Sequence, residues 1–462
     1  MTLVTSSDEA GTGTVGRSNS HRVVVIGAGF AGLAAARALT DTREASVAAP
    51  IEVTLVDRHN FHTFEPLLYQ VATAGLDPGD VAYPVRAIFG KRPGVTFRHA
   101  EVTGIDLSHR SVRLDDGSDL AYDILIVASG AVAAYFGVPG APERALPLYV
   151  LSDARHLRNR LLSVLESADA HPERFDGGAP TFVVIGGGPT GVETSGALVE
   201  LLDAVVRRDR LRLDAARTKV TLVDMGDHLL NGFRARGSRY AEETLRRRGV
   251  DIRLGAAVAS VDDGCVRLAD GSELRASVVI WAGGVTVSGS IADTLEAQQA
   301  RGGRVIVAPD LAVPERPEVF VVGDAAAVPD GHGGTCPQLA QVAIQSGRHA
   351  GRQIRRRLEG LPTEPFSYRD KGVMATVGRR AAVADLPRLP SVTGTIGWLA
   401  WLGLHLVYLI GFRNRAMVLM NWCWRYVDWP SGPRLILADG EPGHRTRSIE
   451  STPPSGSGPT SR

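Results

Sequence analysis

The chain has 462 residues, a length that exceeds a single hydrophobic core and predicts two or three domains. Its net charge is +1 at pH 7, and no cluster of Lys and Arg is interleaved with aromatic residues, which argues against a nucleic-acid partner. Its three cysteines, Cys265, Cys336 and Cys423, are odd in number and far apart, which argues against a disulfide framework or a metal site and suits a reducing cytosol.

The two ends of the chain are polar. Residues 1–20 are rich in Ser, Thr and Gly, and they lack the basic start and apolar core of a signal peptide. Residues 439–462 are equally polar. We expect both ends to be disordered, with the folded part between them.

The first predicted unit is a strand, a Gly-rich turn and a helix, written HRVVVIGAGFAGLAAARAL. Its turn contains Gly27, Gly29 and Gly32, and the strand that follows, VTLVD, ends at Asp57. In such a unit the glycines permit a tight turn, the approach of a phosphate and close packing of helix on strand. The helix N-terminus faces a pyrophosphate, and the acid accepts hydrogen bonds from a ribose. We therefore expect a permanently held dinucleotide here.

The same unit recurs later in the chain as TFVVIGGGPTGVETSGALVELL. Its glycines are Gly186, Gly188 and Gly191, and a second VTLVD ends at Asp224. A carboxylate at that position repels a 2′-phosphate, so this unit predicts NADH rather than NADPH. Because both copies have the strand, the helix and the acid, we favour two dinucleotide sites over Gly-rich turns in ordinary α/β domains.

Three further segments end a strand with small residues. ILIVASGA contains Ser129 and Gly130, and VVIWAGGV contains Gly283; such residues let the chain cross closely beside a nucleotide, although each alone is more often an ordinary turn. In PEVFVVGDAAAVPD, a strand precedes Gly323 and Asp324, and the Ala-rich run predicts a helix. An acid there can bind a ribityl hydroxyl, which supports FAD as the first cofactor. We expect it to be bound non-covalently, since nothing in the sequence indicates a covalent attachment.

Two glutamines mark a candidate acceptor site in CPQLAQVAIQSGRHAGRQI. Read as a helix after Pro337, this segment places Gln341 and Gln345 on one face, surrounded by small apolar residues. Two amides on such a face can bind quinone carbonyls, although paired glutamines on a helix more often face solvent.

The segment from Ile396 to Val427 is apolar and holds most of the chain's tryptophans. Its apolar run is shorter than the about 20 residues of a spanning helix, and Arg413 and Arg415 follow it. We expect interfacial helices, with apolar and Trp faces in the lipid headgroup boundary and Arg side chains reaching anionic lipid. The alternatives are a dimerisation hairpin and a transmembrane anchor.

From His21 to Tyr426 the chain resembles the two-dinucleotide-binding flavoprotein superfamily, and within it type II NADH dehydrogenase. The motifs that carry the resemblance are VVVIGAGFAGL, NFHTFEPLLYQVATAGL, VIGGGPTGVE, VVGDAAA, LAQVAIQSGR, YRDKGVMATVGR and LIGFRNR. One departure is Ser129, where the family usually has Thr, and it keeps the hydroxyl.

The resemblance implies three site roles. It places Glu193 near the nicotinamide beside the flavin, where the alternative is a surface residue in the first turn of a helix. It makes AQVAIQ, with Gln341 and Gln345, the quinone signature. It also places Lys371 near the flavin and the quinone tunnel, where a cation can stabilise negative charge; the alternative is a surface lysine in a turn.

The reaction implied is hydride transfer from NADH to FAD, then two electrons to a membrane quinone, without proton pumping. The chain lacks the paired cysteines that a flavin-to-disulfide relay requires. The alternatives are a soluble NADH oxidase or reductase of a redox protein, and a flavin-bearing membrane sensor or scaffold. Ubiquinone and menaquinone are not distinguished.

The predicted fold class is α/β, with two Rossmann-like dinucleotide-binding domains and a small C-terminal membrane-associated helical module. Residues 21–150 and 291–390 form a discontinuous FAD-binding domain, residues 151–290 the NADH-binding domain, and residues 391–438 the module. We expect a peripheral enzyme on the cytoplasmic face of the cell membrane, with a homodimer through the module as one option.

Overall fold

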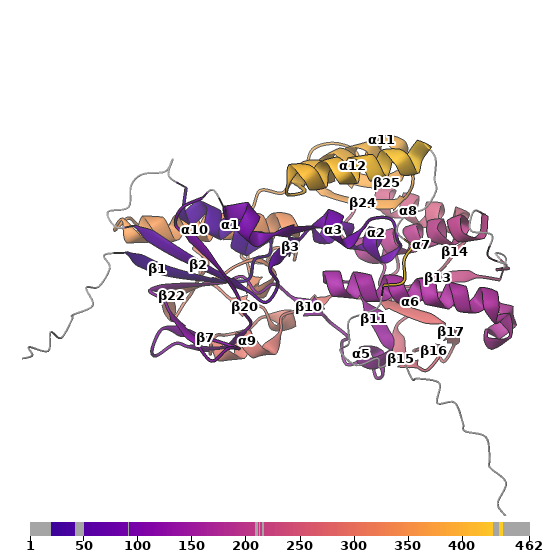
Figure 1. Cartoon of the computed structure of the whole chain (residues 1–462), viewed down its shortest axis with the longest axis horizontal. Coiled ribbons are helices and arrows are strands. Elements are labelled where there is room, and N and C mark those ends of the chain that lie inside the picture. The colour runs from indigo at the N-terminus through magenta and orange to yellow at the C-terminus, as the bar shows by residue number, and fades with distance from the viewer. Residues whose placement is uncertain are drawn as a thin grey trace, which may run out of the picture.

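Two α/β lobes lie side by side, and a pair of C-terminal helices crosses above one of them (Figure 1). This computed structural model describes residues 20–41, 50–90, 92–207, 211, 213–214, 217–427 and 434–437. The ends predicted to be disordered lie outside these residues, except for Ser20. The fold class is α/β with a helical C-terminal layer, as the sequence predicts.

The first lobe is built on a six-stranded sheet with strand order β21-β22-β9-β1-β2-β5. All neighbours in it are parallel except β21 and β22. The central strands are apolar runs because both faces of the sheet are covered. The strands are β1 (His21–Ile26), β2 (Ile51–Asp57), β5 (Val95–His99), β9 (Ile124–Val127), β21 (Ala312–Val313) and β22 (Arg316–Val321).

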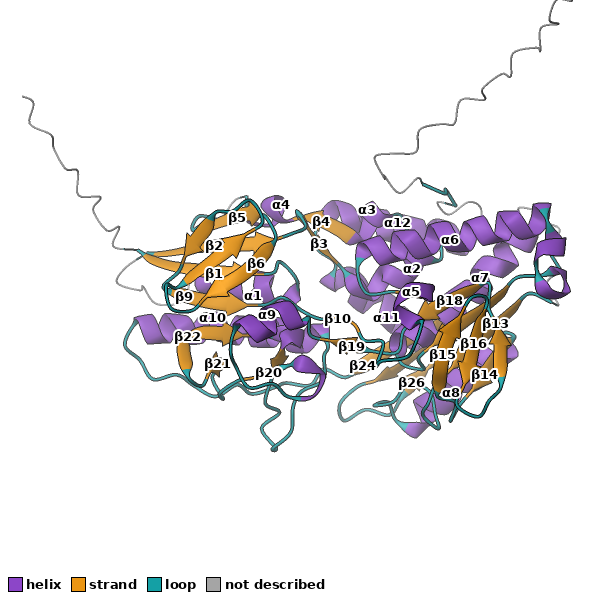
Figure 2. Cartoon of the chain, turned by 90° about the horizontal axis from the view of Figure 1, so that it is seen from below, coloured by secondary structure: helices purple, strands orange, loops and turns teal. Residues whose placement is uncertain are grey.

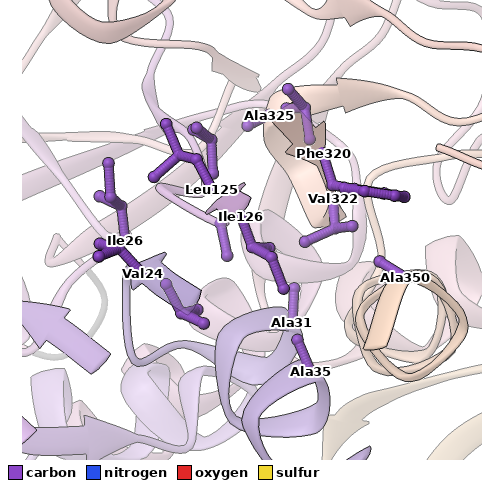
Figure 3. Packing of buried hydrophobic residues seen from close by; sticks show 14 of the residues in the cluster. Val24, Ile26, Ala31, Ala35, Leu125, Ile126, Phe320, Val322, Ala325 and Ala350 are labelled. Carbon is purple, nitrogen blue, oxygen red and sulfur yellow. The ribbon is translucent and has the colours of Figure 1, made fainter. Parts of the chain in front are cut away.

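Two helices, α1 (Phe30–Leu39) and α10 (Ala340–Leu358), cover one face of this sheet (Figure 3). They approach closely because small residues line the contact. A Cβ added to Gly347 would lie 2.1 Å from the Ala31 carbonyl oxygen, and one added to Gly351 would lie 2.9 Å from that of Ala35. The contact fixes α10 against the first Gly-rich turn.

The second lobe has a five-stranded parallel sheet with strand order β11-β18-β12-β13-β14. Long helices flank it. Its elements are β11 (Ala145–Pro147), α6 (Leu151–Ala170), β12 (Thr181–Ile185), α7 (Pro189–Arg207), β13 (Lys219–Val223), α8 (Ala235–Arg247), β14 (Val250–Arg253) and β18 (Val278–Trp281).

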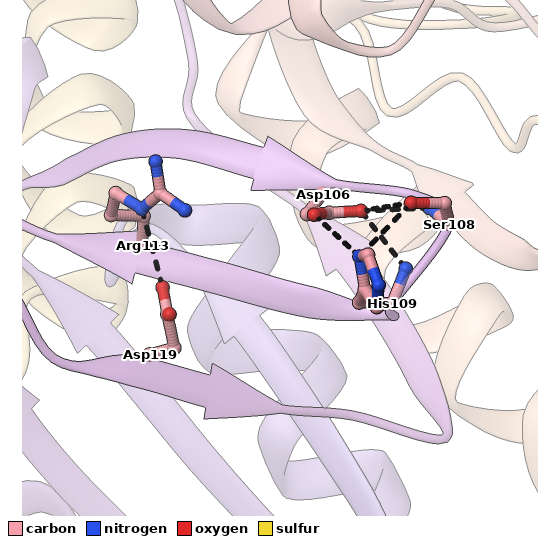
Figure 4. A network of polar contacts seen from close by, with 5 residues as sticks. All are labelled: Asp106, Ser108, His109, Arg113 and Asp119. Carbon is pink, nitrogen blue, oxygen red and sulfur yellow. Dashed lines mark hydrogen bonds and ion pairs between the residues drawn. The ribbon is translucent and has the colours of Figure 1, made fainter.

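The chain crosses between the lobes where β10 (Val132–Ala133) pairs with β19 (Val285–Thr286), as Figure 2 shows. Each lobe also carries a three-stranded antiparallel sheet: β6 (Val102–Asp106), β7 (Ser111–Leu114) and β8 (Asp119–Ala121), and β15 (Val258–Asp262), β16 (Cys265–Leu268) and β17 (Glu273–Arg275). The turn after β6 is closed by Asp106, which accepts hydrogen bonds from Ser108 and His109 (Figure 4). These bonds hold the pKa of Asp106 below its usual range and account for it as a turn residue.

Short elements connect these layers. They are β3 (Phe61–Thr63), η1 (Glu65–Leu67), α2 (Leu68–Ala72), α3 (Pro78–Val81), β4 (Ala82–Pro84), α4 (Val85–Phe89), α5 (Ala141–Arg144), η2 (Pro172–Arg174), η3 (Asp176–Gly178), α9 (Gly289–Thr294), η4 (Arg301–Gly303), β20 (Val305–Ile306), η5 (Gly323–Ala325) and β23 (Ala326–Ala327). The helix expected after Asp324 is therefore wrong: a single 3-10 turn leads into β23, which pairs with β20.

The C-terminal layer consists of β24 (Val373–Gly378), β25 (Ala381–Asp385) and β26 (Val392–Thr393), followed by α11 (Gly394–Tyr408) and α12 (Phe412–Val427). Three of its tryptophans, Trp398, Trp401 and Trp422, are buried in the core of the second lobe, so the expected exposure to lipid is wrong for these three. Trp424 is exposed, and Trp429 lies outside the described residues. The exposed apolar residues are mostly aliphatic. None of the helices in the described part of the chain combines the length and apolar character needed to cross a bilayer.

Candidate active site

A cavity of about 810 Å³ lies beside the first Gly-rich turn. It is lined by Gly27 and Gly29 of the turn, by Asp57 at the end of β2, and by Ser129 and Gly130 after β9. The structure thus brings together residues that the sequence predicted from three separate segments. Its volume falls within the range of pockets that bury a cofactor-sized ligand.

Close packing of the backbone shapes the first turn. Gly27 has φ +99°, and a Cβ there would lie 2.3 Å from the Ala128 carbonyl oxygen. A Cβ on Gly32 would lie 1.8 Å from the Gly27 carbonyl oxygen, so α1 begins directly on the turn. Nothing lies within 4 Å of the Cβ position of Gly29, which leaves that side of the backbone open to a phosphate.

Asp57 holds the turn through its carboxylate. One oxygen accepts the Ala28 N–H at 2.6 Å, and the other accepts the His59 N–H at 2.7 Å. A carboxylate has about four acceptor positions. Lone pairs therefore remain for the ribose hydroxyls that the sequence assigned to Asp57.

Asp324 lies behind the cavity wall rather than on it. The cavity-lining residue Tyr149 donates its hydroxyl to the Asp324 carboxylate at 3.5 Å. Burial raises the pKa of Asp324 to about 6. Gly323 has φ +68°, and it lies so close to α1 that a Cβ there would be 2.9 Å from the Ala31 Cβ. Both the backbone conformation and the close contact therefore favour glycine at this position.

Sequence reasoning missed two polar residues of this cavity, His62 and Glu65. Both lie in NFHTFEPLLYQV, directly after the first unit, and their charge-bearing atoms among apolar neighbours were the available signal. His62 is buried, and its Nδ1 donates to the Ala28 carbonyl at 3.1 Å. Burial lowers the pKa of His62 to about 4, so the ring is neutral and its buried Nε2 is an acceptor without a partner in the described chain.

The second Gly-rich turn repeats the geometry of the first. A Cβ on Gly186, whose φ is +112°, would lie 2.3 Å from the Ala282 carbonyl oxygen and 2.9 Å from the Gly283 nitrogen. The Asp224 carboxylate accepts the N–H groups of Gly187 and Gly226. A Cβ on Gly191 would lie 1.7 Å from the Gly186 carbonyl oxygen, whereas the Cβ position of Gly188 is open. The internal repeat of the sequence is therefore a structural repeat.

Glu193 lies on α7 and points toward the C-terminal layer, at a cavity of about 30 Å³. Its carboxylate accepts the Thr376 N–H at 3.2 Å, and burial raises the pKa of Glu193 to about 8. The Thr376 hydroxyl meets the Tyr69 hydroxyl at 3.0 Å. The space suits one water molecule between these polar groups. Glu193 is therefore a buried group, not a surface residue, and it does not line the large cavity.

The two glutamines do share one face of α10. Gln341 binds both Lys371, through the Lys371 N–H at 3.1 Å, and the Gly372 carbonyl at 3.0 Å. Gln345 binds the N–H and the carbonyl of Arg369, each at 3.0 Å. These amides clamp the Arg369–Gly372 segment, and each keeps one N–H and one lone pair. A solvated helix face, the alternative reading, does not describe them.

Lys371 is held at the end of this clamped segment. Its ammonium group donates to the Tyr408 hydroxyl on α11 at 3.0 Å. Gln341, Lys371 and α11 therefore form one continuous contact between the first lobe and the C-terminal layer. Among the described residues, no group of His, Cys, Asp and Glu side chains is arranged to hold a metal ion, and the three cysteines are free thiols.

Each lobe carries a Gly-rich turn of the kind that binds a dinucleotide, and β10 and β19 connect the two lobes. This arrangement is that of an oxidoreductase that uses a flavin and a pyridine nucleotide. The family model for pyridine nucleotide-disulphide oxidoreductases matches residues 21–347, and the model for the NDH2 C-terminal domain matches residues 371–427.

The relatives narrow this class. Over 442 residues the chain is 37% identical to the type II NADH:quinone oxidoreductase Ndh of Mycobacterium tuberculosis, covering 92% of each chain. It is 39% identical to NdhA of the same organism, covering 90% of each. The chain belongs to the type II NADH:quinone oxidoreductase family.

Solved structures agree with the fold. The structure of NDH2 from Plasmodium falciparum in complex with NADH superposes with a TM-score of 0.79 at 18% identity, over 91% of this chain and 100% of that one. The sulfide:quinone oxidoreductase of Aquifex aeolicus gives 0.69 at 16% identity, over 89% of this chain and 96% of that one.

Proposed function

We propose that this chain oxidises NADH at the second lobe, holds FAD in the large cavity of the first, and reduces a membrane quinone at the face of α10. Family membership makes it an FAD-dependent NADH:quinone oxidoreductase. The observation that carries the site assignment is the large cavity, which brings together the first Gly-rich turn, Asp57, Ser129 and Gly130.

The residues of the large cavity fit FAD. Gly27, Gly29 and Gly32 give a pyrophosphate access to the N-terminus of α1, and Asp57 faces a ribose. Ser129 and Gly130 line the path onward, and Gly323 and Asp324 hold the wall behind Tyr149. The unpartnered His62 Nε2 suits a cofactor hydroxyl. When bound, FAD supplies the two-electron chemistry, and the protein supplies orientation and shielding from water.

On the second lobe, Gly186, Gly188 and Gly191 receive the pyrophosphate of NADH, and Gly283 leaves room for the chain that crosses it. Asp224 selects NADH because its carboxylate repels a 2′-phosphate. Glu193, two residues beyond Gly191, stands between this turn and the C-terminal layer. We assign it to the nicotinamide end of the site, where a carboxyl of raised pKa can hold a proton at neutral pH.

The quinone site is assigned to Gln341, Gln345 and Lys371. The clamped segment fixes the position of the lysine beside α11. The remaining amide N–H groups can bind a quinone carbonyl, and the ammonium group can stabilise the negative charge that develops on reduction.

The exposed side of α11 and α12 is assigned to the bilayer surface, at the cytoplasmic face of the cell membrane. Ile396 is 72% exposed, Phe412 is 87% exposed and Trp424 is 65% exposed, on neighbouring helices. Exposed apolar side chains gathered on one layer mark a membrane or partner surface. A homodimer through the same side chains is the second candidate.

The test follows NADH oxidation by the purified holoprotein with and without a soluble quinone. We expect NADH to bleach the flavin and turnover to require quinone. Gln341→Leu and Gln345→Leu should lower quinone reduction at least tenfold while NADH still reduces the flavin. Gln353→Leu is the matched control, because Gln353 on the same helix also clamps a backbone N–H, that of Glu364.

Other outcomes assign the alternatives. Equal turnover with oxygen or with a redox protein, unaffected by the α10 variants, identifies an oxidase or a protein reductase. Flavin reduction without turnover identifies a sensor or scaffold.

A further inference from the structure

Glu65 is a carboxyl group in the large cavity that the site assignment above does not use. It lies on the short helix η1 and lines the cavity, so that its side chain is accessible from the cavity while protein atoms surround it closely. Its side chain has no hydrogen bond and no ion pair within the described part of the chain. A three-residue helix has no appreciable dipole, so helix capping does not account for the acid.

The groups around Glu65 form a cluster at one end of the cavity. Burial raises the pKa of both Glu65 and Tyr149; repulsion by Asp324, behind the wall, adds to the shift of Glu65, and repulsion by Glu65 adds to that of Tyr149. Burial is the larger cause, and together these effects bring the pKa of Glu65 to about 8. The cavity is also lined by the neutral His62 on β3 and by Arg155 on α6, and Arg304 acts on Asp324. The other charged or titratable residues that line the cavity are Asp57, Arg58, His59, Asp77 and Glu101.

This end of the cavity is the flavin end. Asp57 and the Gly-rich turn take the adenosine and the pyrophosphate, so the remaining half of FAD extends toward Tyr149 and Asp324. His62, whose Nδ1 donates to Ala28 in the Gly-rich turn, supplies a second, independent sign of a ligand in the same cavity, because its buried Nε2 has no partner within the described chain. A cofactor with several hydroxyl and carbonyl groups satisfies both residues.

We propose that Glu65 hydrogen-bonds the flavin half of FAD as a neutral carboxyl, and that its ionisation makes the bound flavin harder to reduce. The inference rests on the FAD assignment made above. A neutral carboxyl can donate to a cofactor oxygen, whereas a carboxylate opposes the electron density that reduction adds. Because FAD displaces water from the cavity and brings negative phosphates, the carboxyl stays neutral at physiological pH.

The test compares the flavin midpoint potential of wild-type holoenzyme and Glu65→Gln, by dye-equilibrated reduction from pH 6.5 to 9.5. At pH 6.5 the two should agree, because both side chains are neutral. At pH 9.5 the equilibrium constant for flavin reduction should be at least tenfold lower in wild type, about 30 mV for a two-electron couple. Glu173→Gln, the same change on the exposed turn η2, should follow wild type throughout.

Two further measurements keep the test decisive if Glu65→Gln folds poorly. Asp324→Asn removes the neighbouring negative charge, so the pKa of Glu65 should fall. The pH above which Glu65 makes the flavin harder to reduce should therefore be lower in this variant than in wild type. The affinity of the apo-protein for FAD should also decline at high pH in wild type. If the midpoint potential of wild type and that of Glu65→Gln change with pH in the same way while quinone turnover is normal, the role of Glu65 is overturned and the proposed function stands. A protein that does not bind FAD would overturn the proposed function itself.

Discussion

At the scale of the single residue, Glu193 is expected to make the stability of the fold depend on pH. Burial raises its pKa to about 8, so the folded protein retains this proton at pH values where the unfolded chain has lost it. The contribution of the protonated Glu193 to the free energy of unfolding is therefore fully present at low pH and declines as pH rises toward 8. One pKa unit corresponds to about 1.4 kcal/mol, so the loss amounts to a few kcal/mol.

Glu193→Gln keeps an oxygen for the Thr376 N–H and cannot ionise. We expect equal thermal stability to wild type near pH 5 and a stability higher by a few kcal/mol at pH 8, measured by thermal unfolding of the holoprotein. Glu173→Gln, on an exposed side chain, should change neither value. A variant that is less stable than wild type at pH 8 would show that the carboxylate form is favoured inside the fold.

The residues that could be predicted from sequence are those whose requirement is local. Gly27 and Gly32 follow from the turn itself, because a Cβ at either would collide with backbone atoms nearby. For Glu65 and His62 the sequence offers only polar residues among apolar neighbours, because their place in the cavity depends on which distant segments close it. The backbone clamps made by Gln341 are likewise a property of the tertiary structure.

At the scale of the element, the contact between α1 and α10 joins the first Gly-rich turn to the proposed quinone face. Gly347→Ala would place a methyl group 2.1 Å from the Ala31 carbonyl oxygen. We expect the free energy of unfolding to fall by about 1–3 kcal/mol and FAD to be bound more weakly, because α1 must move away from its turn. Gly104→Ala on β6 is the control, since nothing lies within 4 Å of its Cβ position. Equal losses in both variants would contradict the packing argument.

Strand–turn–helix units were the elements that sequence could predict, because their periodicity and turn residues agree. The helix expected after Asp324 failed for a tertiary reason. Gly323 turns the chain at φ +68° beside Ala31, and Ala326 and Ala327 then pair with β20. The Ala-rich run has helix propensity, but strand pairing and the space taken by α1 and α10 override it.

At the scale of the whole molecule, the C-terminal layer is part of the core rather than an appendage. Asn414 is buried and donates to the carbonyls of Gly79, Asp80 and Ala82, and the Trp422 indole donates to Gln70. Trp398, Trp401 and Trp422, which composition alone assigned to lipid, serve this docking instead, whereas Trp424 stays exposed. Removing the layer would expose the core of the second lobe, so membrane binding has to be tested with point variants.

Vesicle flotation of the full holoprotein provides that test. The exposed Ile396, Phe412 and Trp424 are expected to insert at the headgroup boundary, so a triple change to Ser should reduce the bound fraction at least tenfold. The changes lie on the solvent side, so FAD content and NADH reduction of the flavin should persist. Met225→Ser is the control, because Met225 is an equally exposed apolar side chain on the second lobe. If the triple variant still floats but elutes as a smaller species, these side chains form a dimer contact, and the bilayer assignment fails.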